Sequence, residues 1–329
     1  MKKILILVLE ALLLVSIMLT SCQFSFFSES NADTTDPMET EGANESAAEA
    51  ESASTEEIED DTPLPNGAPR SLKILAIGNS FSTDAMQYLY EIAKDAGVQR
   101  IVLGNLYYGG CSLQQHLTYG TKNSPSYTYY KNDSGKWETH EDYRMGSALE
   151  DEDWDYISFQ QTSKTCGLRD SYGETLTQLL ELVRSKNSTA KFVWHMTWAY
   201  QQDSTHSSFP KYGNSQQKMY DMIIDCTKNC ILPEEQFELI IPNMTSIQNA
   251  RTSFLGDTLT RDGYHLNLYI GRYIAGLTYF SAITGVSAEH INCNPAPDHI
   301  TEEMLAVAKE SVQNAIAKPY EITQSQLTD

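Results

Sequence analysis

The stretch Leu72-Lys73-Ile74-Leu75-Ala76-Ile77-Gly78-Asn79-Ser80-Phe81-Ser82 decides the fold. Its first six residues are a short, mostly apolar run that ends at a glycine, which is typical of a buried strand. Polar residues follow at once, and Ser82 or Thr83 can cap a helix. The inward positions of this helix are Met86, Leu89, Ala93 and Ala96. A buried strand that leads directly into a helix is the first unit of a parallel α/β sheet.

The same alternation continues along the chain. Further strands are expected over residues 101–107, 156–159, 191–195 and 239–241, and helices over residues 172–184 and 216–230. Strands and helices at this spacing predict a three-layer α/β/α fold around a central, mainly parallel sheet of five strands. The predicted domain spans residues 71–318 and leaves residues 319–329 as a C-terminal tail.

One aromatic stretch, residues 113–145, interrupts the alternation. Its aromatic residues are Tyr119, Tyr127, Tyr129, Tyr130, Trp137 and Tyr143. Long excursions from a compact domain are often binding loops, and these rings would suit stacking on sugar faces. The rings would equally suit a satellite core beneath the loop, and both interpretations stay open.

The N-terminus has the layout of an export signal. Lys2 and Lys3 precede an apolar run of residues 4–19, which is shorter than the roughly 20 residues that a membrane-spanning helix needs. The following Leu19-Thr20-Ser21-Cys22 resembles a bacterial lipobox, which predicts a signal peptide over residues 1–21 and a lipid on Cys22. The expected location is the bacterial cell envelope, with the protein facing away from the cytoplasm and held to the membrane through Cys22.

The charge is concentrated just after that signal. The 329 residues include 44 acidic and 23 basic side chains, a net charge of -21, and residues 23–70 hold thirteen acidic residues against Arg70 alone. Such a segment cannot bury enough apolar surface to fold, so residues 22–70 are predicted to be a lipidated cysteine followed by a disordered tether. The acidity also excludes a general nucleic-acid binder, which needs a basic surface.

The remaining cysteines number five, an odd count for an exported chain, so at least one thiol must lack a partner in the chain. They are Cys111, Cys166, Cys226, Cys230 and Cys293. Cys226 and Cys230 lack nearby histidine or acidic ligands at zinc spacing. We therefore expect buried structural thiols and no metal site.

Two short motifs carry the candidate chemistry. Ser80 follows the first strand, at the sheet edge where ligands bind in open parallel sheets. Far downstream, Asp262-Gly263-Tyr264-His265 sets a carboxylate three residues before an imidazole. In that spacing the carboxylate can hold Nδ1 of the ring and leave Nε2 to take a proton from a serine.

An early serine and a late Asp-x-x-His on an α/β chain resemble the SGNH (GDSL-type) hydrolase superfamily. The likeness is greatest to a branch catalogued as a domain of unknown function that opens with Gly-Asn-Ser-Phe-Ser, found here at residues 78–82. The resemblance covers roughly residues 72–285 and implies a flavodoxin-like fold. It maps the nucleophile on Ser80, the acid on Asp262 and the base on His265.

The resemblance also implies an oxyanion hole formed by the backbone N–H groups of Ser80 and a glycine after the second strand, Gly109 or Gly110, with Gly110 preferred. The family's third donor is an asparagine, but here Gln160 and Gln161 occupy that region. A glutamine amide can donate the same bond, and Gln161 is the narrow choice over Gln160. The other candidate pocket residues are Asn79, Gly109, His195 and Trp198, although His195 can equally be a hydrogen-bonded structural histidine.

The implied activity is that of a surface-anchored serine esterase that removes small, acetyl-like groups from a carbohydrate or another small ester, without metal or organic cofactor. Sequence gives no oligomeric state. The alternative is a lipoprotein that binds glycans or solutes on a hydrolase scaffold without catalysis.

Overall fold

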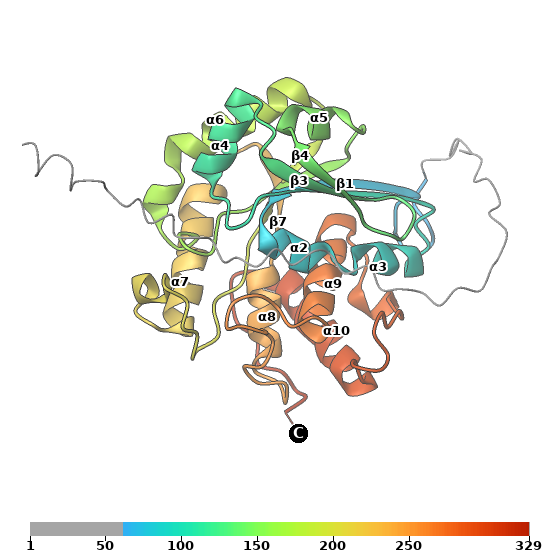
Figure 1. The fold of residues 1–329 in the computed structure, drawn as a ribbon. Coiled ribbons are helices and arrows are strands. Elements are labelled where there is room, and N and C mark those ends of the chain that lie inside the picture. The colour runs from blue at the N-terminus through green and yellow to red at the C-terminus, as the bar shows by residue number, and fades with distance from the viewer. Residues whose placement is uncertain (1–61, 329) are drawn as a thin grey trace, which may run out of the picture. The chain divides into compact units, whose positions relative to one another are not determined.

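A seven-stranded sheet forms the centre of the computed structural model, which describes residues 62–328 (Figure 1). The strand order is β4-β3-β2-β1-β5-β6-β7. The five strands β2, β1, β5, β6 and β7 run parallel, and β3 and β4 are antiparallel to their neighbours. The strands are β1 (Ser71–Gly78), β2 (Arg100–Tyr107), β3 (Tyr127–Asn132), β4 (Glu138–Tyr143), β5 (Tyr156–Phe159), β6 (Lys191–His195) and β7 (Phe237–Ile241).

Helices cover both faces of this sheet, which confirms the predicted three-layer α/β/α fold (Figure 1). One layer holds α2 (Ser80–Met86), α3 (Leu89–Asp95), α8 (Asn243–Ala250), α9 (Ile270–Thr284) and α10 (Glu302–Ala317). The other layer holds α4 (Leu113–Lys122), α5 (Met145–Glu150) and α6 (Gly173–Lys186). The remaining helices are α7 (Gln216–Cys226), the 3-10 turns η1 (Arg169–Ser171), η2 (Phe209–Tyr212) and η4 (Ala288–His290), and the π turn η3 (Thr227–Ile231).

Burial explains why these elements pack as they do. The apolar residues of β1 are at most 1% exposed, as expected for a strand with helices on both sides. On α6, the buried side chains are Leu176, Leu179, Leu180 and Val183, the stripe that a helical period predicts. The helix α9 is buried on nearly all sides because α2, α3, α8 and α10 all pack against it.

The sheet has two strands more than predicted, and they come from the aromatic stretch. Tyr127, Tyr129 and Tyr130 of β3 are at most 4% exposed, and Trp137 is 8% exposed. These four rings are therefore part of the core, and this is the second of the two interpretations. The strand β4 reads Glu138-Thr139-His140-Glu141-Asp142-Tyr143 and is largely exposed, a charged edge that discourages pairing with another chain.

The helix after β1 begins earlier than predicted. Asn79, not Ser82 or Thr83, is the cap residue, because its side-chain oxygen accepts from the Phe81 N–H at 3.1 Å. The Ser82 hydroxyl instead donates to the Asn79 carbonyl at 2.7 Å. Because Asn79 is the cap, Ser80 is the first residue of α2. The predicted continuous helix is also divided into α2 and α3.

Residues on both sides of the predicted domain, residues 71–318, also contact the fold. Before Ser71, Ala68 is fully buried and the Asn66 amide donates to the Ala96 carbonyl at 2.8 Å. In the predicted tail, the Thr323 N–H donates to Asn249 of α8 at 2.7 Å. The predicted signal peptide (residues 1–21), the lipid site Cys22 and most of the predicted tether lie outside the described residues.

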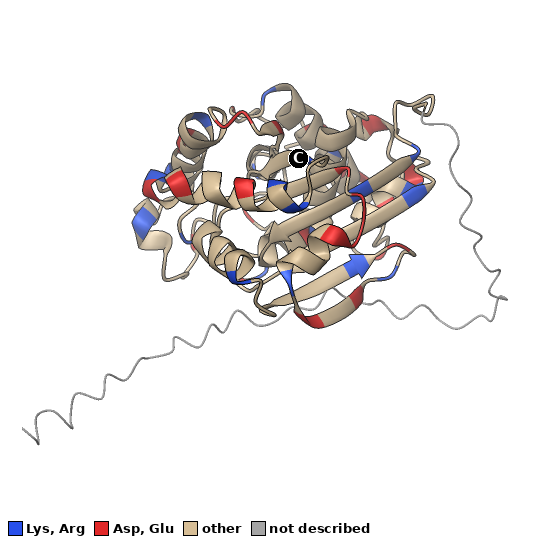
Figure 2. Cartoon of the chain, turned by 90° about the horizontal axis from the view of Figure 1, so that it is seen from above, with Lys and Arg blue, Asp and Glu red and all other residues tan. Residues whose placement is uncertain are grey.

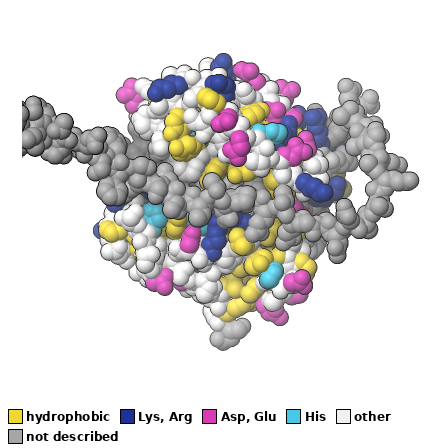
Figure 3. Space-filling view, viewed as in Figure 1, with side chains coloured by type: hydrophobic (Ala, Val, Ile, Leu, Met, Phe, Trp, Pro, Cys, Tyr) yellow, Lys and Arg dark blue, Asp and Glu magenta, His cyan; other side chains and the backbone are white. Residues whose placement is uncertain are grey.

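The surface of the described part mixes residue types. Figure 2 shows acidic and basic residues interspersed along the helices and strands. In Figure 3, apolar side chains reach the surface in separate groups among charged ones. Within residues 62–328, no helix combines the length and apolar character needed to cross a membrane.

Candidate active site

Ser80 and the distant Asp-x-x-His motif meet at the carboxyl edge of the sheet. His265 Nε2 lies 2.8 Å from Ser80 Oγ, although 185 positions separate the two residues. His265 Nδ1 lies 2.6 Å from Asp262 Oδ2. The three side chains thus form the hydrogen-bonded order serine, imidazole, carboxylate, in which the imidazole is held so that Nε2 can accept the serine proton.

The Asp262 side chain accepts hydrogen bonds from the backbone of the turn that it begins. Its Oδ1 accepts from the Tyr264 N–H at 3.1 Å and from the His265 N–H at 2.8 Å, which leaves Oδ2 for the imidazole. Gly263 has a φ of +90°, and a Cβ there would meet the Ser204 backbone at 3.1 Å. Glycine is therefore required for this compact turn.

The carboxylate is held in its charged form. Burial acts to raise the pKa of Asp262, but hydrogen bonds from the His265 ring and from the two backbone N–H groups hold that pKa below its ordinary value. Ser80 is 9% exposed and His265 is 3% exposed, whereas 39% of the Asp262 side chain is exposed. The serine is therefore recessed but is in contact with solvent.

The expected oxyanion donors are the backbone N–H groups of Ser80 and Gly110. The Ser80 N–H belongs to the first turn of α2, where no intrahelical acceptor exists. Gly110 lies in the loop after β2 with a φ of +61°, and this loop is tied to the serine because the Asn79 amide donates to the Cys111 carbonyl at 3.1 Å. Gly109 and Gly110 are half-buried.

The Gln161 side chain points elsewhere. Its Nε2 donates to the Ser171 carbonyl at 2.8 Å and to the Ser171 hydroxyl at 3.1 Å, so both amide hydrogens are used. Its Oε1 accepts from the N–H groups of Leu113 and Thr162. In this arrangement Gln161 joins the loop after β5 to the start of α4 and has no hydrogen left for an oxyanion.

Gln160 belongs to a buried chain of polar side chains. Its Nε2 donates to Asn79 Oδ1 at 2.6 Å, and its Oε1 lies 2.9 Å from His195 Nδ1. His195 Nε2 in turn lies 2.9 Å from the amide of Asn243. Burial lowers the pKa of His195 to about 3, so this ring is neutral, and the amide on its other side assigns the hydrogen to Nδ1.

Three of the four expected pocket residues are buried beneath the site, and the fourth, Gly109, is half-buried. Asn79, His195 and Trp198 are at most 2% exposed. The Trp198 ring stacks on Phe81 with centroids 4.3 Å apart, and its Nε1 donates to the Tyr264 carbonyl at 2.7 Å. Trp198 thus braces both the helix that carries Ser80 and the turn that carries His265, and His195 is structural.

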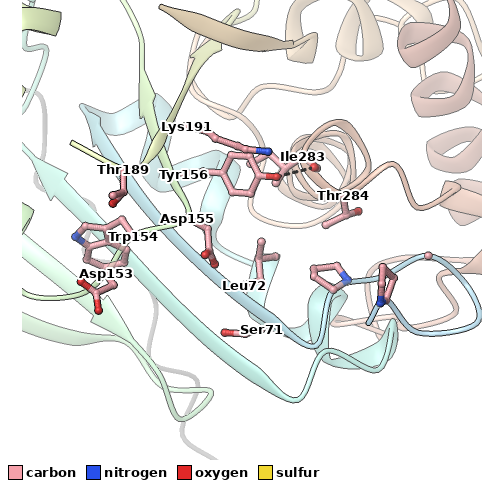
Figure 4. Close-up of a pocket in the computed structure, with 13 residues that line it drawn as sticks. Ser71, Leu72, Asp153, Trp154, Asp155, Tyr156, Thr189, Lys191, Ile283 and Thr284 are labelled. Carbon is pink, nitrogen blue, oxygen red and sulfur yellow. Dashed lines mark hydrogen bonds between the residues drawn. The ribbon is translucent and has the colours of Figure 1, made fainter. Parts of the chain in front are cut away.

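A separate cavity lies at the opposite edge of the sheet (Figure 4). It measures about 500 Å³ and is lined partly by Ser71, Tyr156 and Lys191, the first residues of β1, β5 and β6. Because a strand rises about 3.3 Å per residue, the eight residues of β1 put Ser71 about 23 Å from Gly78, which lies two residues before Ser80. The cavity is not the site at which the motifs meet.

The five cysteines within residues 62–328 are all free thiols, and Cys111, Cys166 and Cys226 are buried. Burial raises the pKa of Cys166, Cys226 and Cys293 to about 12, which leaves these sulfurs protonated and unreactive. In this part of the chain no three His, Cys, Asp or Glu side chains are grouped so that they could hold a metal ion.

Comparison with known proteins adds the family. The sequence profile described as "Domain of unknown function (DUF4886)" matches residues 73–315. The chain belongs to the DUF4886 family. A crystal structure of a DUF4886 family protein from Bacteroides uniformis is 40% identical, with a TM-score of 0.74 over 77% of this chain and 98% of that one. The predicted membership of an uncharacterised family is confirmed.

More distant solved structures are hydrolases by their descriptions. A proposed SGNH hydrolase from Slackia heliotrinireducens is 19% identical, with a TM-score of 0.46 over 65% of this chain and 99% of that one. A carbohydrate esterase family 3 protein from Talaromyces cellulolyticus is 12% identical, with a TM-score of 0.42 over 64% and 94%. Among curated proteins, none matches this DUF4886 chain.

Sequence reasoning missed one group of charged residues next to the motifs. Asp84 is fully buried on α2 and contacts Arg261, Arg272 and the backbone of Leu266. The available signal was an aspartate on the buried first helix, one turn after Ser80, where an unpaired charge would be too costly.

Proposed function

We propose that this protein is a serine hydrolase that cleaves ester bonds, with Ser80 as nucleophile, His265 as general base and acid, and Asp262 as the group that orients the imidazole. The observation that carries the proposal is the pair of short contacts, 2.8 Å from Ser80 to His265 and 2.6 Å from His265 to Asp262. No structural role requires that order of groups at a partly exposed sheet edge.

The proposed reaction has two steps. Ser80 Oγ attacks the ester carbonyl while its proton passes to His265 Nε2, and Asp262 stabilises the resulting imidazolium. The imidazolium then protonates the leaving alcohol, which leaves an acyl group on Ser80. A water molecule then gives a proton to the same ring and attacks this acyl-enzyme. The ring returns that proton to Ser80 Oγ as the carboxylic acid leaves.

The backbone N–H groups of Ser80 and Gly110 are the proposed donors to the oxyanion, because fixed N–H groups stabilise the charge that develops there. Gln161 as a third donor stays a prediction, and it requires the oxyanion to replace Ser171 at the Gln161 amide. Loss of one such donor typically costs about 10²–10³ in rate.

The proposed substrates carry small acyl groups, such as acetyl, on a carbohydrate or a comparable small alcohol. Tyr108 precedes the Gly109-Gly110 pair and Tyr264 packs on His265 with centroids 4.0 Å apart, and both tyrosines are half-buried. Partly exposed rings beside a polar site suit the apolar faces of a sugar. The recessed serine favours a small acyl group over a long chain.

We further propose that Cys22 carries a lipid and anchors the protein to the bacterial envelope, on the basis of the Leu19-Thr20-Ser21-Cys22 motif. The full chain expressed in a bacterium that lipidates proteins should incorporate labelled palmitate and sediment with membranes. A Cys22→Ser variant should do neither, and unchanged labelling of this variant would disprove the anchor.

Hydrolysis of p-nitrophenyl acetate tests the activity. We expect the wild-type chain to hydrolyse this ester and Ser80→Ala to fall to the rate of buffer, because the hydroxyl that lies 2.8 Å from His265 Nε2 is lost. Ser82→Ala is the matched control, since Ser82 is a buried serine on the same helix. Equal rates for wild type and Ser80→Ala would replace the esterase proposal with a non-catalytic binding protein.

A further inference from the structure

Asp84 lies on the helix that carries Ser80 and contacts the segment that carries His265. It lies one turn after Ser80 on α2 and is fully buried. Its Oδ2 accepts from the Leu266 N–H at 2.8 Å, and Leu266 directly follows His265. One carboxylate therefore connects the helix that carries Ser80 to the segment that carries His265.

Two arginines complete this connection through the other carboxylate oxygen. Arg272 Nε donates to Asp84 Oδ1 at 2.9 Å from the buried helix α9, which lies beside α2 in Figure 1. Arg261 Nη1 donates to the same oxygen at 3.1 Å and also donates to the Leu266 carbonyl. The Arg261 N–H donates to the His265 carbonyl at 2.9 Å, so both ends of the turn around Asp262 are held.

We infer that Asp84 is a positioning residue, which with Arg261 fixes the His265 ring against Ser80; this inference rests on the proposed function. A purely structural ion pair would need only Asp84 and the fully buried Arg272. The additional contacts to Leu266 and Arg261 all end on the turn that carries His265. A displacement of about 1 Å between reacting groups can cost about 10²-fold in rate, so rigid placement of this turn has a catalytic consequence.

The first test is Asp84→Asn in the full chain, assayed on p-nitrophenyl acetate. The amide presents an N–H where a carboxylate oxygen accepted a bond, so at least one contact to the turn is lost. We expect kcat to fall about 10²-fold with KM changed less than threefold. Asp151→Asn is the matched control, because Asp151 pairs with Lys131 at 2.9 Å near the opposite edge of the sheet, and its kcat should stay within twofold. A folded Asp84→Asn with kcat within twofold of wild type would overturn the inference.

A second variant decides the case in which Asp84→Asn fails to fold. Arg261→Gln leaves the Asp84–Arg272 pair intact, and the Arg261 side chain is 23% exposed, so this variant should fold with a Tm close to that of the wild type. We expect its kcat to fall about tenfold at unchanged KM. An unchanged kcat in Arg261→Gln would contradict the positioning role.

A crystal structure separates this inference from the proposed function. If the wild-type chain were inactive on every ester, the esterase proposal would fail, but the geometry could still be measured. In Arg261→Gln crystals, a His265 Nε2 out of hydrogen-bond range of Ser80 Oγ would support the positioning role. Retention of the 2.8 Å contact would refute it.

Discussion

His265 and His195 stand at the two ends of one row of aromatic rings and differ in their partners. The row runs from His195 to Trp198, then to Phe81 and His265, with centroids 6.2, 4.3 and 6.0 Å apart. Both rings are almost fully buried and both have a partner on each nitrogen. His265 faces a carboxylate and a hydroxyl, whereas His195 faces the amides of Gln160 and Asn243.

The two histidines differ in the charge of their partners more than in their burial, and this difference separates the proposed catalytic histidine, His265, from His195. A carboxylate stabilises an imidazolium, so His265 can take a proton during a reaction. Two neutral amides offer no such compensation, and burial lowers the pKa of His195 to about 3.

The largest expected effect is on activity at His265. His265→Ala should lower kcat/KM for p-nitrophenyl acetate by about 10⁴-fold or more, because the base and acid of both steps are lost. His195→Ala, assayed at a temperature where it is folded, should lose far less. Equal losses in the two variants would remove the contrast between the rings.

Asp262→Asn should be the next most damaging change. The amide can still close the backbone turn, but it no longer stabilises an imidazolium, and it favours the wrong tautomer of His265. We expect kcat to fall about 10³–10⁴-fold with little change in Tm. Steady-state kinetics together with thermal unfolding measure both quantities, and a fall of less than tenfold would exclude Asp262 as the orienting acid.

His195 should show its importance in stability. His195→Ala leaves buried polar groups of Gln160 and Asn243 without this partner and opens a cavity, so we expect a loss of about 2–4 kcal/mol in the free energy of unfolding. Urea denaturation measures this loss. His140→Ala on the exposed strand β4 is the control and should change stability by less than about 0.5 kcal/mol.

The pH dependence of stability provides the most selective test. Burial lowers the pKa of both His116 and His195 to about 3, against an ordinary value of 6.5. Between these values the unfolded chain binds more protons, so stability should fall as pH falls from 6.5 towards 3, by up to about 1.4 kcal/mol per pH unit for each ring.

The matching variant is His116→Phe, since His116 stacks against Tyr127 with its centroid 5.7 Å away. Urea denaturation at pH 7.0 and 5.0 should show a shallower pH dependence in this variant than in the wild type. His140→Gln should keep the wild-type dependence. A wild-type stability that did not change between these pH values would contradict neutral buried histidines.

Local sequence patterns are enough to predict the parallel core and the two motifs that meet at its carboxyl edge. The five parallel strands are short apolar runs bounded by turns, so periodicity located each of them. Ser80 is indicated by its place after the first strand, at the carboxyl edge of the sheet, and the Asp262–His265 pair by its spacing and by the family resemblance. The spacing of Asp262 and His265 also predicted their contact.

Features that depend on tertiary partners were not predictable in this way. The aromatic residues of β3 have no clear period of two, and only their pairing with β2 makes them a strand. The position of Gln161 after β5 predicts an oxyanion donor, but position alone does not reveal the two hydrogen bonds from its amide to Ser171, ten residues later. The contacts of Asp84 were not predictable because its partner Arg272 lies on α9, 188 positions further along the chain.

Mass spectrometry of the full chain after treatment with a fluorophosphonate tests the central claim most directly. A serine activated by His265 should take up one phosphonyl group, and peptide mapping should locate that group on Ser80. The adduct should be absent from Ser80→Ala and strongly reduced in His265→Ala. An unmodified wild-type chain, or the same adduct in Ser80→Ala, would contradict Ser80 as the nucleophile.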